Sequence, residues 1–181
     1  YKKHGDALGV RWDYAFYQMV LETNYLAFGG DVRPRQNNFA GIGATGGGVP
    51  GDSFPDVSTG VLAQIQHLVV YSGERIAEPT APRTRLKMDE ILGKSLALGR
   101  PVGYHDLAGR WAADRAYGRS IESVAQAFRA TYCSGRAEPA VHAGVPRHWR
   151  DRIVARWSRE TVTDYDDDVP ERPARALDDR D

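Results

Sequence analysis

Apolar residues recur every three or four positions along most of this 181-residue chain, and alternating strand patterns are nearly absent. Such spacing places apolar side chains on one face of a helix, so it predicts a mainly α fold. A glycine-rich stretch over 41–51 predicts a loop, with one small hairpin inside 39–56. Gly29 and Gly30 are expected to end the first helix. The expected helices cover residues 11–27, 57–72, 86–98, 105–113, 118–132 and 147–158.

The charge distribution divides the chain into a globular domain over 1–159 and an acidic tail or linker over 160–181. The tail carries nine acidic residues against three arginines, together with two prolines. Its few apolar side chains would bury too little area to offset the entropy lost on ordering. We expect the basic helix at 147–158 and the tail to connect the domain, through 147–181, to a larger parent protein or assembly.

Composition argues against several classes of function. Lys and Arg total 24 and Asp and Glu total 24, so bulk charge does not favour nucleic acid. No apolar run approaches the ~20 residues of a membrane-spanning helix. The five histidines and Cys133 show no paired metal-ligand spacing, and the glycine run at 41–46 lacks the helix that a dinucleotide site requires after it. We therefore expect no metal, no cofactor, no nucleic acid and no membrane span.

Glu22 stands near the C-terminal end of the first expected helix, where the partial negative charge of the helix dipole disfavours a carboxylate. Apolar neighbours would disfavour the charged form further and raise the pKa of Glu22. A carboxyl group with a raised pKa suits a general acid. The simpler alternative, an exposed glutamate on a polar helix face, is favoured by the spacing alone.

Two further carboxylates, Asp52 and Asp56, follow in the glycine-rich region, with Tyr25, Phe39 and Phe54 nearby in the sequence. A helix-borne acid, a loop carboxylate and aromatic rings that stack on sugars together fit the cleft of a glycosidase. Asp56 has an equally good alternative role as the N-cap of the helix that begins at 57.

Four sequence blocks carry a resemblance to a known family. They read QMVLET at 18–23, QNNFAGIG at 36–43, SFPD at 53–56 with GVLAQIQHL at 60–68, and LAGRWAADRAYG at 107–118. In this order they resemble the N-acetylglucosaminidase domain of glycoside hydrolase family 73, a bacterial family of endo-β-N-acetylglucosaminidases. The similarity covers about residues 11–132.

The resemblance implies a lysozyme-like helical domain with a small loop or hairpin lobe after the catalytic helix. It implies hydrolysis of the β-1,4 bond after N-acetylglucosamine in peptidoglycan. The partners would then be peptidoglycan glycan strands in the cell envelope, with the protein periplasmic, secreted or part of a phage or other assembly. By position, Glu22 matches the general acid, Asp56 lies near a second carboxylate, and Tyr117 matches a tyrosine that lines the cleft. The expected substrate contacts are Tyr25, Asn38, Phe39, Asp52 and Phe54.

Three departures from the family pattern leave the partner of Glu22 open. Family members often carry Glu at the position of Asp56, Asp52 competes for the same role, and Ala113 replaces a common threonine. Retention, inversion and attack by the substrate's own 2-acetamido oxygen all stay open, and all three use Glu22 as the acid. Two other functions stay open as well: a non-catalytic glycan-binding or assembly module on the same fold, and an amidase or peptidase that depends on Cys133.

Overall fold

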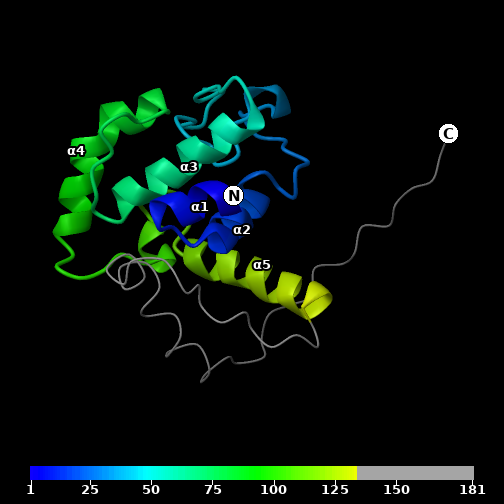
Figure 1. Ribbon diagram of the computed structural model, residues 1–181. Coiled ribbons are helices and arrows are strands. Elements are labelled where there is room, and N and C mark those ends of the chain that lie inside the picture. The colour runs from blue at the N-terminus through cyan, green and yellow to red at the C-terminus, as the bar shows by residue number, and fades with distance from the viewer. Residues whose placement is uncertain (134–181) are drawn as a thin grey trace.

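A computed structural model of the chain describes residues 1–133, and all regular secondary structure in this range is helical (Figure 1). This confirms the predicted mainly α fold. The expected hairpin at 39–56 is reduced to one isolated bridge between Gly46 and Val49, since the glycine-rich segment runs as turns and irregular loop. The elements are α1 (Lys2–Leu8), α2 (Trp12–Glu22), η1 (Pro34–Gln36), α3 (Val57–Tyr71), α4 (Pro82–Leu96), η2 (Tyr104–Leu107) and α5 (Tyr117–Tyr132), where η denotes a short 3-10 helix.

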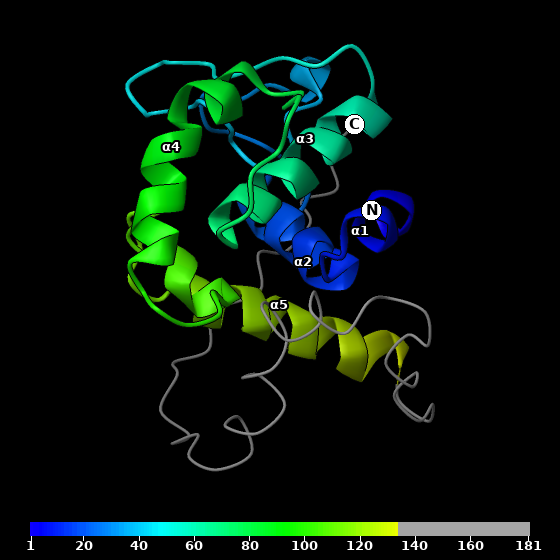
Figure 2. The same cartoon turned by 60° about the vertical axis from the view of Figure 1, so that its left-hand side comes forward.

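Helix α3 lies at the centre of the molecule (Figures 1 and 2). It packs against α1, α2 and α4, while α5 lies along α2 on the side away from α3. Ile65 and Val70 of α3 are fully buried, and so are Ala15 of α2 and Ile121 of α5, so one apolar core joins the three helices. This packing brings the C-terminal end of α2 next to the N-terminal end of α5.

Apolar spacing located two helices almost to the residue. The helices expected at 57–72 and 118–132 appear as α3 and α5. A side-chain cap fixes the start of α3, because Asp56 Oδ1 accepts a hydrogen bond of 2.8 Å from the backbone N–H of Thr59. Both predictions are confirmed. In each helix the apolar side chains that set the predicted spacing are also the ones that pack into the core.

Helix α2 ends earlier than the expected range of 11–27, and the difference shapes the site. Its last residue is Glu22. Residues 24–26 take left-handed conformations, with φ between 49° and 64°, which an α-helix does not accommodate. The buried Thr23 hydroxyl accepts a hydrogen bond of 3.0 Å from the N–H of Leu26 and closes this turn. The expected stop at Gly29 and Gly30 was therefore wrong.

Other boundaries also differ from the expected ones. Helix α4 begins at Pro82 and not at 86, because proline suits the first helical position and Asp52 Oδ2 accepts a hydrogen bond of 2.9 Å from the N–H of Arg83. The helix expected at 105–113 is only η2, since the chain turns at Gly109 with a φ of 70°. Helix α1 was not predicted.

The helix expected at 147–158 and the acidic tail at 160–181 lie outside the described residues. Within residues 1–133, no helix has both the length and the apolar character needed to cross a membrane.

Gly60 allows the first turns of α3 to touch the loop that carries part of the site. A Cβ atom at this position would stand 1.8 Å from the carbonyl oxygen of Asn37. We expect Gly60→Ala to lower the free energy of unfolding by about 1–3 kcal/mol, because the backbone must shift to admit a methyl group.

Gly93→Ala in α4 is the matched control for that substitution. Gly93 is exposed, and an added Cβ would have nothing within 4 Å, so alanine should raise the free energy of unfolding by up to about 1 kcal/mol. Urea unfolding measures both variants. Equal effects of the two substitutions would contradict the close approach at Gly60.

Candidate active site

Glu22 is largely buried where the end of α2 meets the start of α5. Its Oε1 atom accepts a hydrogen bond from the hydroxyl of Tyr117. Burial raises the pKa of Glu22 above its ordinary value, while the hydrogen bond from Tyr117, which favours the charged form, partly opposes this rise. Glu22 is therefore not the exposed surface glutamate of the simpler alternative, and it holds its proton more tightly than such a residue would.

Gly41 stands beside the other carboxyl oxygen of Glu22. A Cβ atom built at Gly41 would lie 3.5 Å from Glu22 Oε2, and the φ of 64° at this glycine is left-handed. Glycine therefore keeps that side of the carboxyl group free of a side chain. One oxygen of Glu22 is engaged by Tyr117, and the other adjoins bare backbone.

Tyr117 is held at the first position of α5 by the turn that precedes it. Asp114 Oδ1 accepts a hydrogen bond of 2.7 Å from the N–H of Ala116, and the Asp114 carbonyl accepts one of 3.3 Å from the N–H of Tyr117. Gly118 follows, where a Cβ atom would stand 2.6 Å from atoms of His105 in η2. Burial raises the pKa of Tyr117 well above its usual range, so its hydroxyl stays a neutral donor.

A chain of hydrogen bonds through two fully buried glutamines leads to Tyr117. The Tyr1 hydroxyl donates to Gln64 Oε1 at 2.6 Å. Gln64 Nε2 donates to the carbonyl of Ala15 at 3.0 Å and to Gln18 Oε1 at 2.9 Å. Gln18 Nε2 then donates to the Tyr117 hydroxyl oxygen at 2.9 Å. Each of the two amide groups is thus bonded at both its nitrogen and its oxygen, as buried polar groups require.

The direction of this chain is fixed by the Ala15 carbonyl, which can only accept. Gln64 must therefore turn its amide nitrogen toward Ala15 and Gln18, and Gln18 must in turn present its nitrogen to Tyr117. Because the Tyr117 oxygen already accepts from Gln18, its single hydrogen is left for Glu22 Oε1. When Glu22 is protonated, its own hydrogen consequently belongs on Oε2, the oxygen beside Gly41.

Sequence reasoning missed Gln18 and Gln64. Both occupy positions of their helices that the apolar spacing assigns to the core, and both are 0% exposed. A glutamine at a core position is a buried polar group that needs partners, and that was the available signal.

The amide side chains of residues 36–38 hold the glycine-rich loop in place. Asn38 Nδ2 donates to the carbonyls of Ile42 and Asp52, at 2.8 and 2.9 Å, and Asn38 Oδ1 accepts from the N–H of Ile42 at 3.0 Å. Gln36 Nε2 donates to the carbonyl of Pro50 at 2.7 Å. These bonds fix the loop on both sides of Gly41, so the loop presents that glycine to Glu22.

Asp52 and Asp56, the two candidates for a second carboxylate, each serve a helix start. Asp52 Oδ2 accepts from the N–H of Arg83 at the first turn of α4. Asp56 is exposed and accepts from the N–H and the hydroxyl of Thr59, at 2.8 and 2.9 Å, which lowers the pKa of Asp56 and keeps it charged. The structure gives Asp56 the capping role, and neither aspartate is hydrogen-bonded to Glu22 or Tyr117.

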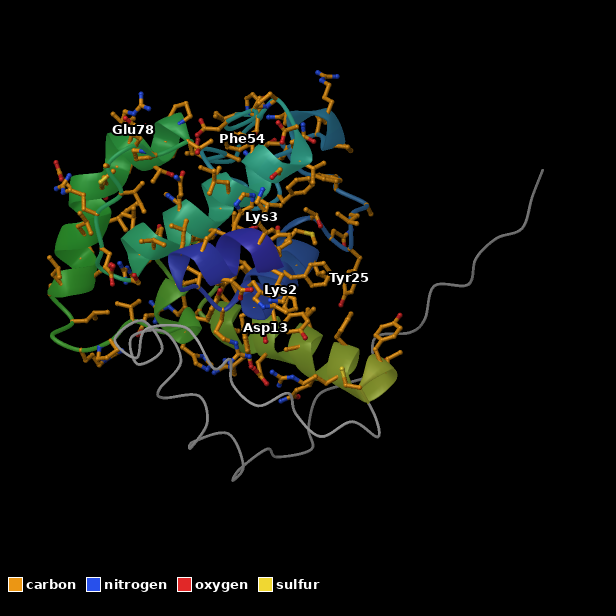
Figure 3. All side chains as sticks on the ribbon, in the orientation of Figure 1. Lys2, Lys3, Asp13, Tyr25, Phe54 and Glu78 are labelled. Carbon is orange, nitrogen blue, oxygen red and sulfur yellow. The ribbon has the colours of Figure 1, made fainter. Side chains whose placement is uncertain are left out.

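The expected substrate contacts separate into exposed and buried residues. Tyr25 is 69% exposed and lies at the outer edge of the described domain (Figure 3). Phe39 is partly buried and packs on the main core. Asn38 and Phe54 are only 1% and 6% exposed, so their side chains hold the loop and fill a small apolar cluster. Of these four residues, Tyr25 offers the most surface to a ligand.

Residues 1–133 contain no cluster of three or more His, Cys, Asp or Glu side chains that could hold a metal ion. Cys133 is exposed after the end of α5. The sequence offers His142 as a base that could activate the Cys133 thiol, and His142 lies outside the described residues.

Comparison with known proteins found a relative from Borreliella burgdorferi that is described as an uncharacterized protein. It is 34% identical to this chain over 116 residues, which make up 64% of this chain and 53% of the relative. The chain thus spans about half the length of the curated relative that it matches. No family model and no solved structure matches the chain.

We expect Tyr117→Phe to raise the pKa of Glu22, because the substitution removes the hydrogen bond that favours the carboxylate. Gln18→Met should raise it less, since the hydroxyl remains and only the donor that orients it is lost. Tyr132→Phe, at an exposed position near the end of α5, is the matched control. Titration of the Glu22 carboxyl carbon by NMR measures all three variants, and an unchanged or lowered pKa in Tyr117→Phe would contradict this geometry.

Proposed function

We propose that the chain is a glycoside hydrolase that cleaves the β-1,4 bond after N-acetylglucosamine in peptidoglycan, with Glu22 as the general acid. One observation carries the proposal. The largely buried carboxyl group of Glu22, whose pKa is raised by burial, has one oxygen bonded to Tyr117 and the other beside the bare backbone of Gly41. A general acid has to keep its proton near neutral pH and deliver it to the leaving oxygen.

In the first step, Glu22 donates the proton on Oε2 to the glycosidic oxygen while the bond between that oxygen and the sugar carbon C1 breaks. Glu22 is left as a carboxylate. The hydrogen bond from Tyr117 to Oε1 strengthens as that charge develops, because hydrogen bonds to ionised acceptors are stronger than those to neutral ones. Tyr117 therefore assists the departure of the proton without giving up its own.

The group that attacks C1 is, in this proposal, the substrate's own 2-acetamido oxygen. Asp52 and Asp56 are both engaged at helix starts, which favours this route over direct attack by either carboxylate. The acetamido oxygen bonds to C1 as the glycosidic bond breaks, giving a cyclic oxazolinium. Water then attacks C1, the bond from C1 to the acetamido oxygen breaks, and the water's proton returns to Glu22.

The wider setting belongs to the same proposal. Tyr25 lies three residues after Glu22 and is exposed, so its ring would stack on a sugar of the glycan strand. The loop over 36–54 would form the facing lobe of a lysozyme-like domain, and the protein would work in the cell envelope. The resemblance of the four sequence blocks supports the lobe and the cell-envelope setting, and the exposure of Tyr25 supports its contact with the glycan.

We expect Glu22→Gln to fold normally and to lose activity on purified peptidoglycan by a factor of about 10²–10⁴, because glutamine has the same shape and no carboxylic proton to donate. Release of new reducing-end N-acetylglucosamine, identified by mass spectrometry, measures the rate. A folded Glu22→Gln protein within about tenfold of the wild-type rate would remove Glu22 from this role.

Asp52→Asn and Asp56→Asn are the matched controls. Each removes a carboxylate while asparagine still caps a helix, and both should keep the rate within about tenfold. A larger loss in either would identify a second catalytic carboxylate.

Wild-type protein that sediments with peptidoglycan and releases no reducing ends would instead favour a non-catalytic glycan-binding module. Inactivation by thiol alkylation would point to Cys133.

A further inference from the structure

A polar cavity of about 170 Å³ lies between α3, α4 and the segment that carries Gly109 and Arg110. None of the residues that line it belongs to the hydrogen-bond chain that ends at Glu22. Helix α4 forms one wall of the cavity and packs on α3 at the left edge of the described domain in Figure 1, the side that comes forward in Figure 2. Tyr25, three residues after Glu22, lies at the opposite edge in Figure 3. The side chains that decide its chemistry are Arg83, Lys87, Lys94, Arg110, Glu90 and His67.

Positive charge around this cavity exceeds negative charge by three. Four cationic side chains face one carboxylate, Glu90, which is shared by Lys87 at 2.8 Å and Lys94 at 2.7 Å. Among the described residues, no carboxylate lies within ion-pair distance of Arg83 or Arg110. This excess is local, because the chain as a whole has a net charge of zero.

Arg110 forms part of the cavity wall and has no ion pair among the described residues. Its Nη2 donates to Ser95 Oγ, and its guanidinium carbon lies 5.1 Å from the centre of the Tyr71 ring. Its Nε and Nη1 atoms are buried and have no hydrogen-bond partner among the described residues. Asp106, the acid that acts on Arg110 from farther away, is already paired with Arg100. Buried guanidinium nitrogens without hydrogen-bond partners are costly, and an anion bound beside Arg110 would offset that cost.

His67 adds an uncharged polar group to the same wall. It is 7% exposed, its Nδ1 atom lies 2.8 Å from Thr84 Oγ1, and its other ring nitrogen has no partner among the described residues. Burial lowers the pKa of His67 to about 4, so the ring is neutral at pH 7 and contributes hydrogen-bonding capacity without charge. The wall thus combines unpaired hydrogen-bonding atoms with excess positive charge.

We infer that this cavity binds a doubly charged oxyanion, a phosphate group, between the side chains of Arg83 and Lys94 and above Arg110. Guanidinium and ammonium groups are the usual protein partners of phosphate oxygens. A dianion matches the excess charge better than a single carboxylate does. The volume suits a small group rather than a length of polymer, and the inference does not depend on the proposed glycosidase activity.

Isothermal titration calorimetry of the full chain with inorganic phosphate, at ionic strength held constant with sodium chloride, tests the site. We expect saturable binding to one site in the wild type and binding at least about tenfold weaker in Arg83→Gln/Lys94→Gln. The matched control is Lys3→Gln/Arg35→Gln, which removes the same charge from exposed residues on α1 and η1 and should bind within about twofold of the wild type.

A parallel titration with glucose 6-phosphate distinguishes the two sources of the group. Binding of both compounds, each weakened in Arg83→Gln/Lys94→Gln, would assign the site to phosphate monoesters. Binding of inorganic phosphate alone would assign it to the free ion, and either outcome supports the inference. Absence of saturable binding in the wild type, or an equal loss in the control variant, would overturn it. Neither titration depends on cleavage of peptidoglycan. Circular dichroism verifies that each variant is folded.

Discussion

The hydrogen bond from Tyr117 to Glu22 joins the end of α2 to the start of α5, and the rest of the site is arranged around it. Gln18 and Gln64 set the direction of that bond from inside the core. The loop over 36–54, fixed by its own amide side chains, places Gly41 beside the free oxygen of the acid. These contacts give Glu22 one defined oxygen for its proton, and this geometry is the physical basis of the proposed hydrolysis.

The sequence predicted the features that follow from a local pattern: two helices, a raised pKa and a helix cap. Continuous apolar spacing located α3 and α5 to within a residue, because the core face of each is unbroken. The position of Glu22 at a helix end, with apolar neighbours, predicted a raised pKa, and burial does raise it. Asp56 was visible as a helix cap, and it caps α3.

Features that depend on tertiary contacts could not be predicted from the sequence. The end of α2 is set by the left-handed turn at 24–26, although neither Tyr25 nor Leu26 favours that conformation by itself. In the sequence, Asn38 is a polar loop residue that could face a ligand. In the structure its side chain is buried and makes three hydrogen bonds to the backbone. Asp52 reads as a loop carboxylate, but it meets the start of α4, 31 positions later. Such pairings appear only when distant segments are brought together.

The most direct measurement is the free energy of unfolding as a function of pH for the wild type and Glu22→Gln. Because burial raises the pKa of Glu22 above its ordinary value of 4.5, the native state binds that proton more tightly than the unfolded state does. The stability that this residue contributes is therefore present below about pH 4 and is lost as the pH rises through the native pKa. The account predicts that Glu22→Gln is more stable than the wild type at pH 7, with a gain that shrinks toward zero near pH 3.5. A variant that is no more stable than the wild type at pH 7, or a difference in stability that does not change with pH, would contradict a raised pKa of Glu22 in the native state.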